Sequence, residues 1–148
     1  EHNHDVIREM LDHDVTIPGA SDGGAHCGLI CDASFPTYLL THWARDRSRG
    51  PKLPLERVVQ LQTSKTADAY GLKDRGRIEV GKLADINVID FDNLHLHAPK
   101  MVHDLPAGGR RLLQDVDGYR YTIKSGHVTF ENGEPTGARP GGVLRSGR

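Results

Sequence analysis

The spacing of apolar residues changes at Gly71, and this change constrains the fold of the chain more than any other feature. Three segments before Gly71 repeat apolar residues at helical spacing, and these are residues 5–13, 36–47 and 55–70. After Gly71, short β-branched runs alternate with turn pairs such as Ser125-Gly126. The sequence therefore predicts helices and one strand first and short β-hairpins later, an α/β plus β fold.

Residues that begin and end secondary structure place these elements more closely. Asp5 is the expected N-cap of the first helix, and Pro36 suits the first turn of the second. Gly71 is the expected stop after the third helix. The run Ile86 to Ile89 and the stretch YRYTIKSGHVTFENGEPTG, residues 119–137, predict strands joined by tight turns.

The composition limits the classes of protein to which the chain can belong. Its 148 residues suffice for one ordinary domain, and 36% hydrophobic residues with a mean hydropathy of -0.51 indicate a modest core. A net charge of -1 gives no reason to expect nucleic acid or an anionic membrane as a partner. No apolar run approaches the roughly 20 residues of a membrane span. Two cysteines, Cys27 and Cys31, fit a reducing cytosol, so we expect a cytoplasmic protein.

The stretch PGASDGGAHCG, residues 18–28, follows an apolar run at residues 15–17. We expect residues 15–21 to form a short buried strand with Asp22 at its end and a glycine-rich loop after it. Catalytic groups of (β/α) barrels lie at the C-terminal ends of strands. At such a position Asp22 can bind a metal or transfer a proton, or it can hydrogen-bond to its own loop backbone. His26 can assist Asp22, line the site, or simply help the loop to pack.

Two further groups of possible metal ligands lie near the start of the chain. His26, Cys27 and Cys31 allow a zinc site, but a closed zinc site needs four ligands and no second cluster follows in the sequence. His2 and His4 have the spacing of a metal pair, yet they precede a helix rather than follow a buried strand. We therefore expect these two histidines to be exposed to solvent.

Two motifs in the second half favour a structural interpretation. His95 and His97 alternate with leucines, as residues of a half-buried strand do. The stretch DLPAGGRR, residues 104–111, could cradle a phosphate, but it has no Lys-Ser or Lys-Thr pair of a P-loop. We therefore expect a tight turn there.

Several motifs together resemble one enzyme family over essentially the whole chain. They are SDGGAH at residues 21–26, LERVVQLQTSKTADAYGLKDRGRIEVGKLADINVID at 55–90, DLPAGGRRL at 104–112 and GYRYTIKSGHVTFENGEPTGARPGGVLR at 118–145. The chain thus resembles the C-terminal part of an amidohydrolase-superfamily enzyme of the N-acyl-D-amino-acid deacylase branch. GKLADINVID is the general signature, whereas SDGGAH and TGARPGGVLR are more specific to the branch.

The resemblance implies a fold and a site. The fold would be the C-terminal segment of a metal-dependent (β/α)8 barrel, with the last barrel strand at 15–21, followed by part of a small β-sandwich. Asp22 would be the catalytic residue, which takes a proton from the attacking water and passes it to the leaving amine, and it is also a possible metal ligand. A divalent metal such as zinc would polarise the amide carbonyl. The substrate loop would comprise the neighbours of Asp22, namely Ser21, Gly23, Gly24 and His26.

The resemblance also implies what this chain would not contain. The metal-binding histidines of the family, and its bridging Cys, Glu or carbamylated Lys, would lie before residue 1. We therefore expect residues 1–148 to be inactive alone and to hold no catalytic metal tightly. The expected partners are a small-molecule amide and either the rest of a parent polypeptide or further copies of the chain.

Three functions remain open at this point. The first is hydrolysis of a linear amide such as an N-acyl amino acid. Residues 31–45, CDASFPTYLLTHWAR, stand where the deacylase branch has a His-Pro-Arg-like stretch, which keeps open the second, a cyclic-amide hydrolase resembling hydantoinases or dihydroorotases. The third is a β-rich interaction module without catalysis. We expect residues 1–72 to be the end of the barrel and residues 73–148 to be the sandwich portion and tail.

Overall fold

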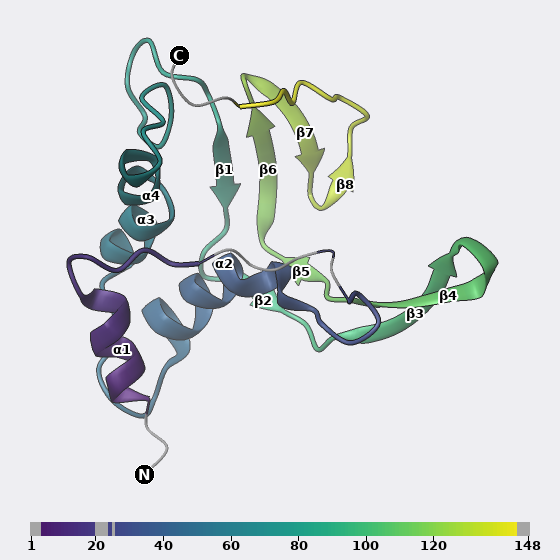
Figure 1. The fold of residues 1–148 in the computed structure, drawn as a ribbon, viewed down its shortest axis with the longest axis horizontal. Helices are drawn as coiled ribbons and strands as arrows, with labels where there is room; N and C mark the ends of the chain where they lie inside the picture. Colours follow the sequence, from purple (N-terminus) through teal and green to yellow (C-terminus); the bar gives the residue numbers. More distant parts are fainter. Residues whose placement is uncertain (1–3, 20–23, 25, 145–148) are drawn as a thin grey trace. The chain divides into compact units, whose positions relative to one another are not determined.

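The computed structural model describes residues 4–19, 24 and 26–144 (Figure 1). Within it the chain forms two compact units that interleave along the sequence. Unit 1 comprises Glu1–Val59 with His95–Val116, and unit 2 comprises Gln60–Leu94 with Asp117–Arg148. The expected division at residues 72 and 73 does not coincide with these units, and as a division of a larger enzyme it stays a prediction.

The helical elements lie mainly in the first half of the chain, as the periodicity predicts. They are α1 (Asp5–Asp12), the 3₁₀ turn η1 (Asp32–Ser34), α2 (Phe35–Tyr38), the π-helix η2 (Leu39–Asp46), α3 (Leu55–Gln62), α4 (Ser64–Ala69) and a second 3₁₀ turn, η3 (Pro106–Gly108). The strands are β1 (Ile86–Ile89), β2 (His95–Leu96), β3 (Lys100–Leu105), β4 (Gly109–Leu113), β5 (Val116–Asp117), β6 (Tyr119–Lys124), β7 (His127–Glu131) and β8 (Glu134–Pro135).

Each predicted helix is present, but each differs from its prediction in a detail. Asp5 is the first residue of α1 rather than its N-cap, because its carboxylate accepts a hydrogen bond from Arg47 instead of capping the helix. The helix predicted over 36–47 passes from 3₁₀ through α to π geometry. The helix predicted over 55–70 is broken at Thr63, whose φ of -123° and ψ of -95° are not helical.

The strand predicted over 15–21 is wrong for the residues that the structure describes. Residues 16–19 have no assigned secondary structure, and Val15 is 82% exposed. The described strands pair only among themselves, so residues 16–19 take part in no ladder. A strand exists only beside a partner strand, and a short apolar run cannot supply that partner by itself. The last two residues of the predicted strand lie outside the described part.

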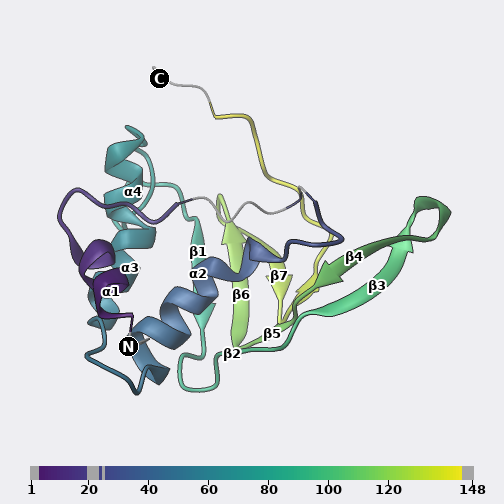
Figure 2. The same ribbon diagram turned by 60° about the horizontal axis from the view of Figure 1, so that its bottom comes forward.

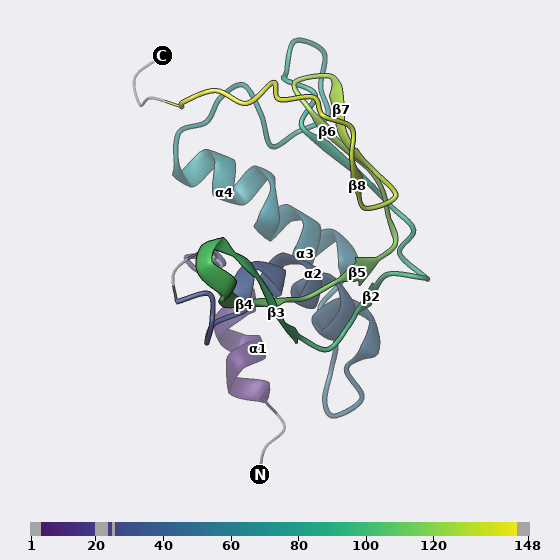
Figure 3. The same ribbon diagram turned by 90° about the vertical axis from the view of Figure 1, so that its right-hand side faces the viewer.

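The sheet of unit 2 confirms the predicted hairpins. Its strand order is β1-β6-β7-β8, with antiparallel pairing throughout, and Figure 3 shows it close to edge-on. The turns at Ser125-Gly126 and Asn132-Gly133 have positive φ at all four residues, which is the backbone that two-residue hairpin turns require. The local sequence therefore encodes this sheet well.

Unit 1 contains a long hairpin of its own, which the sequence indicated only as a turn. β3 pairs antiparallel with β4, and η3 lies in the turn between them (Figures 1 and 2). Ala107 and Gly108 both have positive φ, in agreement with the tight turn predicted for DLPAGGRR. β2 pairs with β5, so His95 lies in a short strand as the alternating pattern predicts.

The buried apolar side chains are few, as the composition indicates. In unit 1 they are Leu40, Trp43, Leu53 and Val58, and in unit 2 they are Leu61, Ala67 and Leu94. The described residues thus form a mixed α/β structure with small sheets and no closed barrel. No described helix has the length and apolar character needed to span a bilayer.

Candidate functional site

The predicted site lies only partly within the described residues. Asp22, Ser21 and Gly23 are outside them, so the structure does not test these three. Gly24 is described, with a φ of +101°, a conformation that L side chains rarely adopt and that accounts for glycine at this position. His26 is also in the left-handed region, with a φ of 49°. The backbone therefore takes a positive φ at both of these described residues, Gly24 and His26.

His26 begins a tight turn in the second half of this loop. Its carbonyl oxygen accepts hydrogen bonds from the backbone N–H groups of Leu29 at 2.8 Å and Ile30 at 2.9 Å. The residue itself is exposed. An exposed imidazole on a closed turn is accessible to a small molecule, which is compatible with the predicted loop role and equally with a solvent-facing residue.

The loop is anchored to the β3–β4 hairpin through backbone atoms. The N–H of Leu112, in β4, donates to the carbonyl oxygen of Cys27 at 2.7 Å. The next residue, Gly28, lies against Arg110, because a Cβ built on Gly28 would be 3.5 Å from Arg110 Cγ. β4 is thus the element that positions the C-terminal half of the loop, and nothing in the sequence indicates this contact.

The described histidines, cysteines and carboxylates do not form a closed metal site. No group of three or more such side chains in the described part lies close enough to hold an ion. Cys27 and Cys31 are free thiols of intermediate exposure. The zinc site that His26, Cys27 and Cys31 would allow is therefore not formed by these residues, because their side chains do not converge. A divalent metal does not fit the described residues without ligands from elsewhere.

A recess of about 240 Å³ lies next to the end of the loop. It is lined by Cys31, Ala33, Ser34 and Thr37 on one side and by Leu96, Leu112, Leu113, Gln114 and Val116 on the other. The strand residues among them are mostly aliphatic, so the recess suits an apolar group better than a charged one. All its lining residues belong to unit 1.

The π-helix η2 carries a histidine, His42, whose pKa is shifted. His42 stacks on Tyr38 with ring centroids 4.9 Å apart, and the ring of Trp43 meets it edge-on at 5.1 Å. Burial lowers the pKa of His42, and the charges of Arg47 and His4 lower it further against an opposing effect of Asp46. The imidazole is therefore neutral near pH 7, which suits its place in an aromatic stack.

Arg47 lies at the centre of a buried cluster in unit 1, which we call the Arg47 cluster. Its side chain is 2% exposed and lies over the ring of Trp43, 4.9 Å from the centroid. The guanidinium donates to the carbonyl oxygens of Arg49 at 3.1 Å and Pro51 at 2.9 Å, and to the carboxylate of Asp5. The cluster ties α1 to the segment that follows η2.

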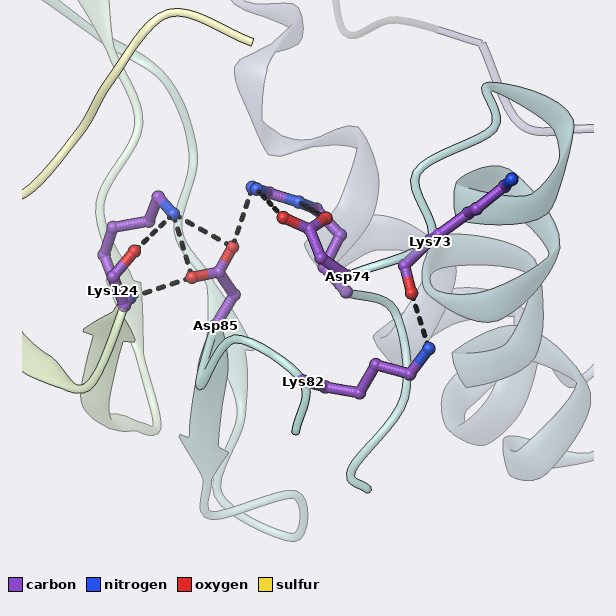
Figure 4. Close-up of polar contacts among 7 residues, drawn as sticks. Lys73, Asp74, Lys82, Asp85 and Lys124 are labelled. Atoms are coloured by element: carbon purple, nitrogen blue, oxygen red, sulfur yellow. Dashed lines mark hydrogen bonds and ion pairs between the residues drawn. The ribbon is translucent and has the colours of Figure 1, made fainter. Parts of the chain in front are cut away.

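Asp85 lies at the centre of a second charged cluster, in unit 2, which we call the Asp85 cluster (Figure 4). Lys124 Nζ donates to both carboxylate oxygens at 2.9 and 3.0 Å, Arg75 donates to Oδ2 at 3.1 Å, and the N–H of Ser125 donates to Oδ1 at 2.8 Å. Arg75 also pairs with Asp74. Burial alone would raise the pKa of Asp85, but these hydrogen bonds and charges together lower it.

The Asp85 cluster explains part of the GKLADINVID signature. The carboxylate of Asp85 and the carbonyl oxygen of Ala84 bind the backbone N–H groups of the turn residues Ser125 and Gly126. This fixes the segment before β1 onto the β6–β7 turn. These hydrogen bonds of the signature therefore help to assemble the sheet of unit 2.

Comparison with known proteins identifies the family. The model of the amidohydrolase family matches residues 1–130. No solved structure is a significant match. Over 142 residues the chain is 30% identical to an N-acyl-D-glutamate deacylase of Alcaligenes xylosoxydans xylosoxydans, covering 94% of this chain and 26% of that protein.

Two archaeal relatives carry a different name, 5-methylthioadenosine/S-adenosylhomocysteine deaminase. The protein of Natronomonas pharaonis is 29% identical over 141 residues, which cover 94% of this chain and 31% of the relative. That of Halobacterium salinarum is 39% identical over 82 residues, or 55% of this chain and 18% of the relative. The chain thus spans less than a third of the length of these curated relatives. Since the family model covers most of its residues, the chain belongs to the amidohydrolase family.

Proposed function

We propose that residues 1–148 are the C-terminal part of an amidohydrolase that hydrolyses a linear amide, an N-acyl amino acid. The observation that carries this proposal is the family match over residues 1–130, which includes the loop with Asp22 and His26. The N-acyl-D-glutamate deacylase, 30% identical over nearly the whole chain, supports the choice of an N-acyl amino acid. The relatives are more than three times longer than this chain, which supports a larger active enzyme.

In this proposal Asp22 moves the proton. Its carboxylate accepts a proton from the attacking water and then donates it to the nitrogen of the leaving amine. The glycines that follow Asp22, Gly23 and Gly24, would allow the backbone to approach the substrate closely. Ser21 and His26 would line the same loop. The hydrogen bond between Leu112 and Cys27 holds the end of the loop against β4.

Zinc or another divalent metal would polarise the amide carbonyl in the complete enzyme. The described residues cannot hold it, so its ligands would come from other parts of a longer polypeptide, with or without Asp22. For the same reason we expect the 148-residue chain alone to bind no catalytic metal tightly and to be inactive.

A hydrolytic deaminase is the second candidate. It is favoured by the two archaeal relatives, whose identities to this chain are comparable with that of the deacylase. Both reactions add water to a carbon and release an amine, so Asp22 would have the same role in each. The two candidates differ in the product, which is an amino acid in one case and ammonia in the other.

The test uses the enzyme expressed from the complete reading frame that contains these residues. N-acetyl amino acids of both configurations, a hydantoin and 5-methylthioadenosine are offered as substrates, and release of amino acid, ring-opened product or ammonia is measured. Asp22→Asn should reduce turnover about 10²–10⁴-fold with unchanged thermal stability, because an amide cannot accept the proton. The matched control is Asp14→Asn, a change at an exposed carboxylate outside the loop, which should leave turnover unchanged. Near-normal turnover of Asp22→Asn would remove Asp22 from this role.

We also propose that the isolated chain is ordered only beside the rest of its polypeptide or as an oligomer of itself. Val6, Ile7 and Met10 of α1 are 68%, 45% and 62% exposed, although they form the apolar face of the predicted helix. An apolar helix face of this kind is normally buried against a partner. Light scattering on the purified chain should show self-association, and a stable monomer at low micromolar concentration would contradict it.

A further inference from the structure

β2 and the residue that follows it carry two histidines whose rings lie close together. The ring centroids of His95 and His97 are 4.7 Å apart, and the planes of the two rings are inclined at 86° to each other. His95 is exposed and His97 is half-buried. Alternate residues of an extended strand point to the same side, so the spacing of two residues accounts for this arrangement. The proposed function makes no use of the pair.

The backbone that carries the two rings is held by hydrogen bonds. The N–H of His97 donates to the carbonyl oxygen of Asp115 at 3.0 Å, and its carbonyl oxygen accepts from the side-chain amide of Gln114 at 2.7 Å. β2, which begins at His95, pairs with β5 (Figure 1). Because this backbone is already ordered, both rings can bind one ligand at a smaller cost in conformational entropy than on a mobile loop.

The distance between the rings matches that of two imidazoles on one metal ion. With metal–nitrogen bonds of about 2.0–2.1 Å, the two centroids lie about 4.5 Å apart for an angle of about 90° at the metal and about 5.2 Å apart for a tetrahedral angle. The observed 4.7 Å is closer to the first value. The ring centroid lies near the Cβ–Cγ axis, so rotation about χ2 can turn a nitrogen toward the ion while this distance is nearly kept. An angle near 90° is typical of the tetragonal sites of Cu(II) and Ni(II).

We propose that His95 and His97 form an open binding site for a divalent transition-metal ion of the Cu(II) or Ni(II) class. This inference does not rest on the proposed function. Neutral imidazole is a preferred ligand of these ions, and Cu(II) has the highest affinity in the divalent first-row series. The two histidines would occupy two adjacent coordination positions. Water would complete the coordination, since the described residues bring no third ligand to the ion.

The charges beside the pair are balanced. Asp115, whose backbone binds His97, forms an ion pair with Lys100. The hydrogen bond from Lys100 and the nearby charge of His97 lower the pKa of Asp115. A bound dication would be attracted by this carboxylate and repelled by the ammonium group, and solvent screens both effects because both side chains are 57% exposed. The affinity should therefore come mainly from the two nitrogen ligands, and losing either one should be measurable.

The experiment uses the enzyme expressed from the complete reading frame and saturated with zinc, so that stronger zinc sites are occupied. Less than one equivalent of Cu(II) is added, and the superhyperfine pattern of its electron paramagnetic resonance spectrum distinguishes one bound nitrogen from two. Titration calorimetry gives the dissociation constant. The wild type should show two nitrogens. His95→Gln should show one and should raise the dissociation constant at least about 10-fold, because a second ligand on the same chain acts at high effective concentration.

The controls are His103→Gln in β3 and His127→Gln in β7. Each removes an exposed histidine that has no second histidine two positions away, and each should leave the spectrum and the dissociation constant unchanged. A single bound nitrogen in the wild type, or equal dissociation constants for the wild type and His95→Gln, would overturn the site. Should His95→Gln not fold, as judged by thermal unfolding, His97→Gln decides the outcome by the same two measurements.

Discussion

The Arg47 cluster and the Asp85 cluster both join segments that are distant in the sequence. They do so with central residues of opposite charge and different burial. Arg47 is a cation with a side chain 2% exposed, and it is satisfied mainly by backbone carbonyl oxygens and by one carboxylate. Asp85 is an anion with a side chain 25% exposed, and it is satisfied by two cations and a backbone N–H. Each ties together segments that are distant in the sequence, α1 with residues 47–51 in one case and the start of β1 with the β6–β7 turn in the other.

The difference shows how burial decides what each partner contributes. Water can replace a lost partner at a site that is one quarter exposed, whereas it cannot reach a side chain that is almost fully buried. The buried guanidinium of Arg47 therefore depends on its acceptors much more than the carboxylate of Asp85 depends on its donors. We expect substitutions in the two clusters to lower the free energy of unfolding by different amounts. For the Asp85 cluster we also expect this amount to depend on pH.

The largest effect is expected for Arg47→Met. Methionine fills much of the same volume but leaves the carbonyl oxygens of Arg49 and Pro51 and the carboxylate of Asp5 without their donor. The free energy of unfolding should fall by about 2–4 kcal/mol. Urea unfolding of the full-length protein measures the loss, and hydrogen exchange should locate it in peptides covering α1 and residues 43–51.

Arg49→Met provides the control for this prediction. Arg49 is exposed, and its contribution to the cluster is a backbone oxygen that the substitution retains. The free energy of unfolding should change by less than about 0.5 kcal/mol. Equal losses for the two variants would show that burial of Arg47 does not distinguish it from a surface arginine.

A smaller effect is expected for Asp85→Asn. The amide keeps the shape of the side chain and its oxygen can still accept from Ser125 N–H, but the attraction of Lys124 and Arg75 is lost. We expect a decrease of about 1–2 kcal/mol in the free energy of unfolding. Faster hydrogen exchange should appear in peptides of β1 and the β6–β7 turn, while α1 stays unchanged. Glu131→Gln, at an exposed position in β7, is the control, and an effect of the same size there would contradict the prediction.

The smallest effect is expected for the Asp85 cluster in acid. The pKa of Asp85 is lowered in the folded chain, so its stabilising contribution is complete above its ordinary value of about 3.9 and is lost as the pH falls through the folded value. The stability difference between wild type and Asp85→Asn should therefore shrink between pH 5 and pH 3. Denaturant unfolding at both pH values measures it. A difference that stays constant would mean that the charge of Asp85 contributes nothing.

Sequence reasoning located the elements whose signals are local. The hairpins of unit 2 follow from alternating β-branched residues and from turn pairs such as Asn132-Gly133, which act over a few neighbours. The helix α1 follows from apolar spacing within one turn of helix. By contrast, the run at residues 15–17 has the same local composition as a strand, and only the absence of a partner in the described structure distinguishes the two. The break of the helix at Thr63 was not predicted, because no glycine or proline lies there in the sequence.

The candidate site was accessible to sequence reasoning only in part. The loop with Asp22 and His26 stands out through its glycines and its place after an apolar run, but the catalytic role of Asp22 follows from the resemblance and stays a prediction. The contact between Arg110 and Gly28 could not be predicted in this way, since it depends on the docking of β4 against a loop more than 80 positions earlier in the sequence. The motif DLPAGGRR predicts its turn, but nothing in it indicates this contact.

The π geometry of η2 has a consequence for how the length of this segment can vary. Its final hydrogen bond runs from the N–H of Arg47 to the carbonyl of His42, a span of five residues, which is one more than an α-helix uses. Deleting one residue between Leu39 and Asp46 would let the helix relax to α geometry, in which each residue turns the chain further about the axis. The larger rotation per residue would offset the missing residue, so Arg47 would keep nearly the same direction toward Arg49 and Pro51. A deletion of one residue should therefore be found in this helix in sequences that keep the buried arginine, whereas a deletion of two residues should not.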